Sequence, residues 1–183
     1  MDLTEAQRDI ARAYVNGAPG VLVSGVVWLA AAIVGSSQGR LLAFAVLFFG
    51  GMLIVPLSGL IARTVFKAGK AAAGNPLERL GFESTVMLFA GILMAWVLLE
   101  VRPQLAFPAI ALAIGARYFT FRTIYDETVY WLLGAVLMAI GTVAMIAPFP
   151  LPLGTLWLVG IAECVFAAVL LMRWKSRSGA YPG

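Results

Sequence analysis

Two long runs of apolar residues without any charge set the first limit on the fold. Residues 13–39 and 41–62 each supply the ~20 apolar residues that a helix needs to cross a hydrocarbon layer of ~30 Å. A soluble domain of 183 residues has no means of burying an apolar content of 62%. The sequence therefore predicts an integral membrane protein and excludes a water-soluble enzyme, a disordered chain and a disulfide-built secreted domain.

The remaining apolar runs raise the expected number of membrane helices to six. Residues 84–99 form a third run, and residues 103–116 form a weaker fourth. The run 128–162 is too long for one helix, and prolines at alternate positions within 147–154 divide it, because proline does not continue a helix. We therefore predict an all-α membrane protein with helices near residues 16–35, 41–64, 80–101, 103–121, 128–147 and 154–173.

Positive charge decides whether the weak fourth run crosses the membrane. Six crossings place eleven of the thirteen Lys and Arg residues on one side and only Arg40 and Arg102 on the other. With five crossings the two sides carry six and seven, which removes the asymmetry. Because positively charged loops stay in the cytoplasm, we predict six crossings with both termini cytoplasmic. Residues 1–15 and 174–183 are the expected cytoplasmic ends.

The N-terminal segment has the pattern of a short amphipathic helix. Thr4 followed by Gln7 resembles a capping box, which predicts a helix from Glu5 to about Tyr14. Its apolar face, which includes Ile10, is expected to lie on the inner leaflet of the membrane. One interpretation is a helical lead-in to the first crossing, and the other is a docking helix for a protein partner.

Several kinds of chemistry are excluded by residues that the chain lacks. It contains no histidine and a single cysteine, Cys164, so a histidine-bound metal, a serine–histidine pair and an internal disulfide are all excluded. We expect no metal, no cofactor and no catalytic residue, and an intramembrane enzyme acting on lipid is a minor alternative. The basic residues lie beside membrane ends without an ordered aromatic patch, so nucleic-acid binding is not expected.

Glu163 is the residue that points most strongly to a functional site. It lies near the middle of the run 154–173, about 14 Å from either end. An ionised carboxylate there costs at least ~2.5 kcal/mol, so we expect it to face the bundle interior or a water pocket. We interpret it as a proton, cation or cationic-substrate site, and the alternative is a buried acid with a structural role. The candidate partners at similar depth are Ser24, Trp28, Trp96 and Thr142.

A second candidate site follows the fourth predicted helix. Residues 116–127 include Arg117, Arg122, Asp126 and Glu127, which are able to pair across the turn, among aromatic residues typical of a membrane interface. One interpretation is a structural anchor at the cytoplasmic interface. The other is a cytoplasmic gate or an anion-binding pocket, with Arg117 and Arg122 as the donors.

The predicted helices also suggest an internal repeat. The second and fifth runs each place a glycine before a proline, as Gly50 before Pro56 and Gly141 before Pro148. Two halves of three helices in opposite orientation are the plan of many transporters, in which broken helices form the binding site. A 3+3 inverted repeat is therefore a hypothesis for this chain.

The chain contains GAPGVLVSGVVWL at residues 17–29 and ARYFTFRTIY at residues 116–125. These stretches resemble a bacterial family of small, uncharacterised membrane proteins with six helices, known only as a domain of unknown function. The resemblance covers nearly the whole chain and implies a multi-pass protein of a bacterial cytoplasmic membrane. It implies no activity, substrate or site residue.

Two functional hypotheses from different classes remain. The first is a small transporter or channel, working as a homo-oligomer, with Glu163 as the group that titrates or binds a cation. It predicts a polar, hydrated cavity that reaches Glu163. The second is a non-catalytic accessory or scaffold protein that binds an unidentified membrane partner through its cytoplasmic face. It predicts a dry, closely packed bundle.

Overall fold

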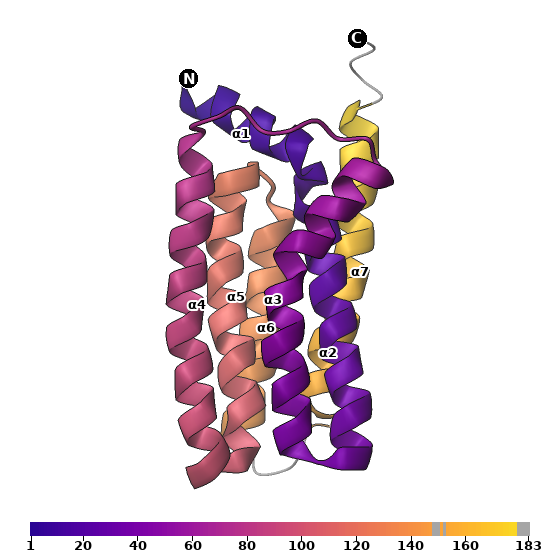
Figure 1. Cartoon of the computed structure of the whole chain (residues 1–183). Helices are drawn as coiled ribbons and strands as arrows, with labels where there is room; N and C mark the ends of the chain where they lie inside the picture. Colours follow the sequence, from indigo (N-terminus) through magenta and orange to yellow (C-terminus); the bar gives the residue numbers. More distant parts are fainter. Residues whose placement is uncertain (148–150, 152, 179–183) are drawn as a thin grey trace.

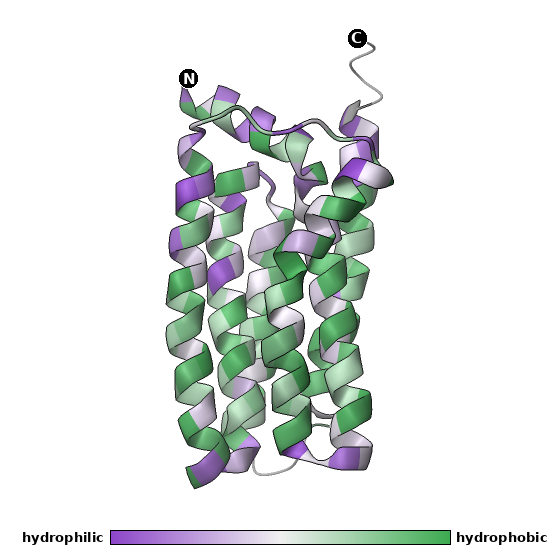
Figure 2. Ribbon diagram, in the orientation of Figure 1, coloured by the Kyte–Doolittle hydropathy of each residue, from purple (hydrophilic) through white to green (hydrophobic). Residues whose placement is uncertain are grey.

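The computed structural model describes residues 1–147, 151 and 153–178, and most of these residues are helical. The chain begins with a short helix, α1 (Leu3–Ala13). Six longer helices follow, which are α2 (Ala18–Gln38), α3 (Arg40–Thr64), α4 (Pro76–Val101), α5 (Ala106–Tyr125), α6 (Val129–Ile146) and α7 (Gly154–Ser178). All six are long and apolar enough to cross a membrane, and Figure 2 shows their largely hydrophobic surfaces. The protein is therefore an all-α, multi-pass membrane protein, as the charge-free runs predict.

Helix α4 begins at Pro76, four residues before the start that the sequence predicts. Asn75 caps it, because its side-chain oxygen accepts the backbone N–H of Leu77 at 3.0 Å. Proline at the first helical position suits this start, since its missing N–H has no partner there in any case. The three prolines between the last two predicted helices, Pro148, Pro150 and Pro152, lie outside the described residues.

The membrane helices form an incomplete ring (Figure 1). α2 packs between α3 and α7, α5 packs between α4 and α6, and α6 packs beside α7. α3 and α4 follow one another in the chain but make little contact. The N-terminus and the last turn of α7 lie at one end of the molecule, which we call the α1 end, and the other is the far end. The cytoplasmic location of the α1 end and the inverted repeat stay predictions.

Glycines allow neighbouring helices to approach closely. A Cβ atom added to Gly25 of α2 would lie 2.8 Å from the sulfur of Cys164 in α7. One added to Gly115 of α5 would lie 2.9 Å from the carbonyl oxygen of Gly134 in α6. Neither position has room for a side chain, so the close packing of these two helix pairs depends on small residues.

α3 and α4 meet near the far end and diverge toward the α1 end. Near the far end, the ring centroids of Phe44 in α3 and Trp96 in α4 are 5.4 Å apart. Toward the α1 end, α3 leans away from α4 and toward α7 (Figure 1). There Phe66, just beyond α3, meets Trp174 of α7 at 5.7 Å between ring centroids. The boundary between α3 and α4 is therefore closed at one end and open at the other.

The N-terminal helix begins two residues earlier than predicted. Asp2 accepts the N–H of Glu5 at 2.8 Å, and Glu5 in turn accepts the N–H of Asp2 at 3.0 Å, which makes a capping box. The predicted box of Thr4 and Gln7 is wrong, because Gln7 is engaged elsewhere. Its side-chain amide donates to the carbonyl of Thr123 at 2.7 Å.

α1 lies across the α1 end of the bundle (Figure 1). Its buried residues Ala6 and Ile10 pack with Leu77 of α4 and Ile124 of α5. The expectation that this apolar face lies on the membrane surface is therefore wrong, because the ends of α4 and α5 cover it.

Asp9 fastens α1 to the connection between α3 and α4. Its Oδ2 accepts the backbone N–H of Ala72 at 2.7 Å and the side-chain amide of Asn75 at 3.0 Å. Both bonds favour the ionised carboxylate, so they hold the pKa of Asp9 below its ordinary value of 3.8. The stability they contribute is present above pH 3.8 and is lost as the pH falls through the lower pKa of the folded state.

We expect Asp9→Ala to release α1 while the membrane helices stay folded. Losing two hydrogen bonds to a charged acceptor should ease local opening by about 1–3 kcal/mol, which is about five- to 150-fold in exchange rate. Hydrogen exchange of α1 and of residues 66–75 at pH 7 measures this change. Arg12→Ala, which removes only the ion pair of an exposed guanidinium with Asp9, is the control. Equal exchange in the two variants would contradict the assignment.

Candidate functional site

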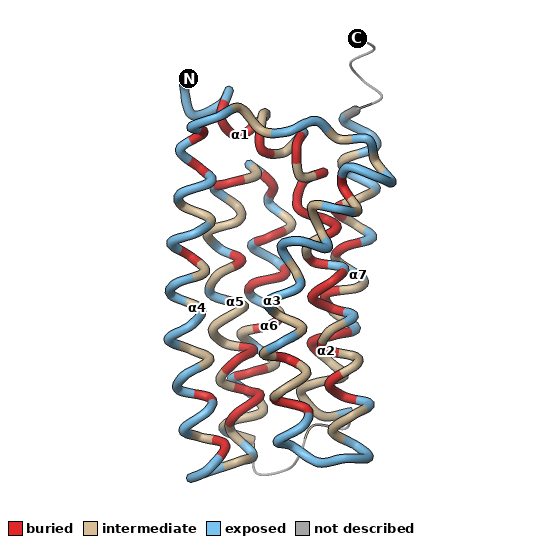
Figure 3. Tube along the Cα trace, in the orientation of Figure 1, coloured by how far each residue is buried: buried red, intermediate tan, exposed pale blue. Residues whose placement is uncertain are grey.

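A pocket of about 510 Å³ lies where α3 and α4 diverge. Its rim is formed by side chains that are exposed on the bundle surface, such as Val55 of α3 and Phe82 of α4, each 69% exposed. Its floor is formed by buried side chains of α2 and α5, including Trp28, 1% exposed, and Tyr118, 5% exposed. Figure 3 shows the same contrast between exposed outer helices and a more buried interior. The pocket therefore opens sideways, toward the region that lipid occupies.

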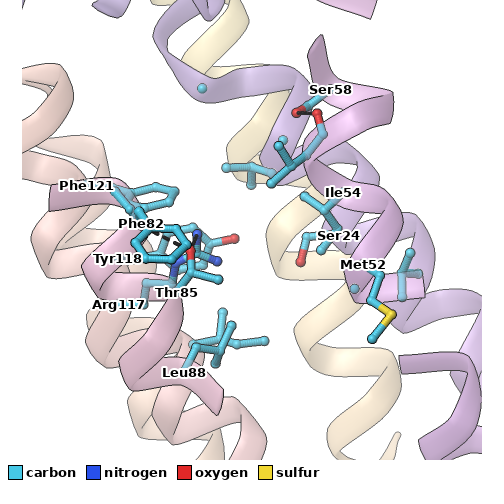
Figure 4. A pocket seen from close by; sticks show the side chains of 18 of the residues that line it. Ser24, Met52, Ile54, Ser58, Phe82, Thr85, Leu88, Arg117, Tyr118 and Phe121 are labelled. Carbon is cyan, nitrogen blue, oxygen red and sulfur yellow. Dashed lines mark hydrogen bonds between the residues drawn. The ribbon is translucent and has the colours of Figure 1, made fainter. Parts of the chain in front are cut away.

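Two walls face each other across the pocket (Figure 4). One carries Arg117, Tyr118 and Thr85 from α5 and α4, and the other carries Ser24 and Ser58 from α2 and α3. The rest of the lining is mainly aliphatic and aromatic. The pocket is therefore an apolar space with a few polar groups, which is the usual composition of a small-molecule site.

Arg117 of α5 is the positively charged side chain among the described residues of the pocket lining, which also includes Glu78 of α4. Its Nη2 donates to the hydroxyl of Thr85 at 2.9 Å and its Nε to the hydroxyl of Ser84 at 3.3 Å. Its guanidinium carbon lies 4.8 Å from the ring centre of Phe121. Among the described residues, no carboxylate lies within ion-pair distance of Arg117. Neutral groups thus fix the guanidinium, and the nearby carboxyl of Glu163 acts on its charge without forming an ion pair.

Glu163 of α7 is fully buried directly behind the pocket floor. The hydroxyl of Tyr118 donates to its Oε1 at 2.6 Å, and the hydroxyl of Ser24 faces the same carboxyl group. Its Oε2 has no hydrogen-bond partner within the described part of the chain. Because Tyr118 and Ser24 also line the pocket, a single layer of side chains separates Glu163 from it.

The partners predicted for Glu163 fall into two groups. Ser24 and Trp28 both line the pocket. Trp96 lies near the far end against Phe44, and Thr142 is exposed on α6. Tyr118, the donor to Glu163, is one of the aromatic residues within 116–127 for which the sequence predicts a place at the membrane interface. No local signal pairs it with Glu163, since 45 residues separate the two.

The four charged residues predicted as a gate or anion site are distributed over three places. Arg122 and Asp126 pair at 3.7 Å on the surface. Glu127 is fully buried, and its two oxygens lie 2.9 Å and 3.1 Å from two arginines near the end of α7. Those arginines are Arg173 and Arg177. Arg117 alone of the four faces the pocket.

The described residues contain no cluster of three or more His, Cys, Asp or Glu side chains close enough to hold a metal ion. The candidate site is therefore built from an arginine, hydroxyl groups and a single buried carboxyl. Such a set is able to bind an anion, to hold a proton and to relay hydrogen bonds.

The comparison with protein families gives one match. A family of unknown function (DUF7010) matches residues 3–173. No curated protein and no solved structure matches the chain. The family match confirms the resemblance that the sequence indicated and adds no activity.

We expect Tyr118→Phe to destabilise the protein by about 1–3 kcal/mol, because the buried carboxyl loses a hydrogen-bond donor. In a Glu163→Leu background the same change should cost close to nothing, because no buried acceptor is left unpaired. Thermal or denaturant unfolding in detergent micelles gives the four stabilities of this double-mutant cycle. An equal cost of Tyr118→Phe in both backgrounds would mean that the hydroxyl and the carboxyl do not interact.

Proposed function

We propose a function from the geometry of the site, because the chain belongs to a family of unknown function (DUF7010). The protein is a small membrane transporter whose substrate binds in the pocket between α3 and α4, with Glu163 as the group that takes up and releases a proton. The observation that carries this proposal is the position of Tyr118. Its ring lines the pocket, and its hydroxyl binds the buried Glu163 carboxyl.

The shape of the pocket supports transport. Its walls separate toward the α1 end, whereas Phe44 and Trp96 close the boundary near the far end. A site between two helices that are parted along one half of their length and joined along the other is suited to one state of an alternating-access cycle. Because α3 and α4 share few contacts, separating them breaks little packing between these two helices themselves. In the predicted topology the end at which α3 and α4 diverge is the cytoplasmic one, and there Ile10 and Tyr14 of α1 line the pocket.

The surroundings of Glu163 support its role as a proton carrier. An ionisable group in the middle of a membrane helix is costly, and such groups commonly serve proton or ion pathways. Oε1 accepts the Tyr118 hydroxyl, and Oε2 has no partner among the described residues. A proton added to Oε2 therefore displaces no hydrogen bond. The carboxyl is able to change its charge while Tyr118 holds it in place.

The alternative is an accessory protein that binds a partner through its cytoplasmic face. The N-terminal helix was the predicted docking element, and its buried residues Ala6 and Ile10 already pack against α4 and α5. A pocket of about 510 Å³ also differs from the dry, closely packed bundle that this hypothesis predicts. We therefore place transport first, although the pocket is more apolar than the hydrated cavity expected from sequence.

The proposal predicts that the opening between α3 and α4 depends on pH through Glu163. Spin labels at Leu60→Cys of α3 and Phe82→Cys of α4, both lipid-exposed positions, report the distance between the two helices. With Cys164→Ser as background, the distance distribution in liposomes should change between low and high pH. Glu163→Gln, the shape of the protonated acid, should hold the low-pH distribution at every pH.

Glu100→Gln is the matched control, because Glu100 is an exposed carboxyl near the far end of α4. The Glu100→Gln protein should show the same pH response as the spin-labelled protein that carries neither glutamate substitution. A distribution that ignores pH, or one that responds equally in the Glu163→Gln protein, would overturn the assignment of the proton to Glu163.

A further inference from the structure

The depth of Arg117 separates it from an ordinary interfacial anchor. It lies eight residues before the end of α5, about 12 Å below the α1 end of that helix. A charged side chain costs roughly 2.5–3.5 kcal/mol at the centre of a membrane helix and is normally paired there. Its partners here are the neutral hydroxyls of Ser84 and Thr85. The pocket therefore holds a positive charge that forms no direct ion pair within the described residues. The Glu163 carboxyl acts on this charge only from behind Tyr118, and Glu78, which also lines the pocket, accepts a hydrogen bond from Tyr14.

The guanidinium retains donors for a further ligand. It has five N–H groups, and two of its nitrogens donate to Ser84 and Thr85. These two bonds and the ring of Phe121 fix its plane at the pocket wall. A fixed guanidinium with free N–H groups binds a carboxylate or a phosphate through paired hydrogen bonds. The ligand that balances this charge is therefore an anion.

The rest of the pocket is suited to a hydrocarbon chain. From the level of Arg117 the lining continues toward the far end along apolar side chains, as far as Trp28, Phe44 and Ile110. The exposed rim residues leave the side of the pocket open between α3 and α4. A molecule with its charged head at Arg117 would direct its tail toward the far end, and it would enter sideways from the membrane.

We infer that the pocket binds a single-chain anionic amphiphile taken from the bilayer, with its head group at Arg117 and its chain between α3 and α4. A single chain fits better than a two-chain phospholipid. The volume of about 510 Å³ is that of a small-molecule site. Arg117 also lies about 12 Å from the α1 end of its helix, a depth that the small carboxylate of a fatty acid reaches more readily than the bulkier head group of a phospholipid. This inference names the substrate class of the proposed transporter and rests on that proposal.

The test is photo-crosslinking of the full-length protein in liposomes with a diazirine analogue of palmitate. Mass spectrometry should find the probe on residues that line the pocket, in addition to general labelling of lipid-facing surfaces. Oleate should compete for the pocket labelling only. Oleyl alcohol has the same chain without the charge, and acetate has the charge without the chain, so both should compete at least about tenfold more weakly.

Arg117→Gln should weaken oleate competition by about tenfold or more, because a charge-assisted contact is lost. Arg122→Gln is the matched control, since Arg122 is partly exposed and pairs with Asp126 on the surface. Gly51→Phe tests whether the hydrocarbon chain of the ligand occupies the pocket, and it leaves Arg117 unchanged. Gly51 lines the pocket, and a Cβ atom there meets nothing within 4 Å. Gly59→Phe, with equal free space on the same helix outside the pocket lining, is its control.

Pocket labelling lost in Arg117→Gln and Gly51→Phe, and kept in both controls, would support the inference. Labelling that oleyl alcohol displaces as well as oleate, or that Arg117→Gln leaves unchanged, would overturn it. The failure of the transport proposal is distinguishable from this result. Oleate binding without any pH response of the α3–α4 distance refutes the role of Glu163 and leaves the ligand class standing. A pH response of that distance without oleate binding in the pocket refutes the ligand class alone.

Discussion

Contact at glycines is the constraint on which the shape of this protein depends. α2 and α7 approach through Gly25 and Gly160, where an added Cβ would lie 2.8 Å from Cys164 and from Leu29 respectively. α4 approaches α5 in the same way, since a Cβ on Gly91 would overlap Ala113. No glycine contact of this kind joins α3 to α4 in the described residues. Side chains without close partners remain at that boundary, and the pocket forms there.

The charges within the membrane region are arranged at graded depths. Nearest the α1 end, Glu127 is matched by Arg173 and Arg177, so two basic side chains cover one buried carboxylate. Deeper, Arg117 and Glu163 each form hydrogen bonds with neutral hydroxyl groups, and their charges interact without a direct ion pair. A direct ion pair between them would cancel both charges and fill the pocket wall. Their separation leaves Oε2 of Glu163 without a hydrogen-bond partner among the described residues, and it leaves Arg117 with N–H groups that Ser84 and Thr85 do not use.

The sequence predicts those features that depend on composition along one helix. Uncharged runs give the six crossings, and the cost of a carboxylate at mid-helix gives the burial of Glu163. The sequence alone does not predict features that depend on how one helix is aligned along another. The bond between Tyr118 and Glu163 requires the relative depth of α5 and α7, and the position of α1 requires the contacts of Asp9 with Ala72. The capping box at Asp2 and Glu5 differs from the one that the sequence analysis predicts at Thr4 and Gln7, because Gln7 instead bonds to Thr123 of α5.

The two walls of the pocket are also joined by the chain itself. Residues 65–75 run from the end of α3 to the start of α4, and α1 holds this connection at Ala72 through Asp9. The free length that remains is residues 65–71, which reach about 23–25 Å when fully extended. Through this hydrogen bond, α1 therefore shortens the part of the connection that is free to extend between α3 and α4. The position of the Asp9–Ala72 bond limits the separation that α3 and α4 are able to reach while the bond is kept, although α1 itself lies outside the membrane-spanning helices.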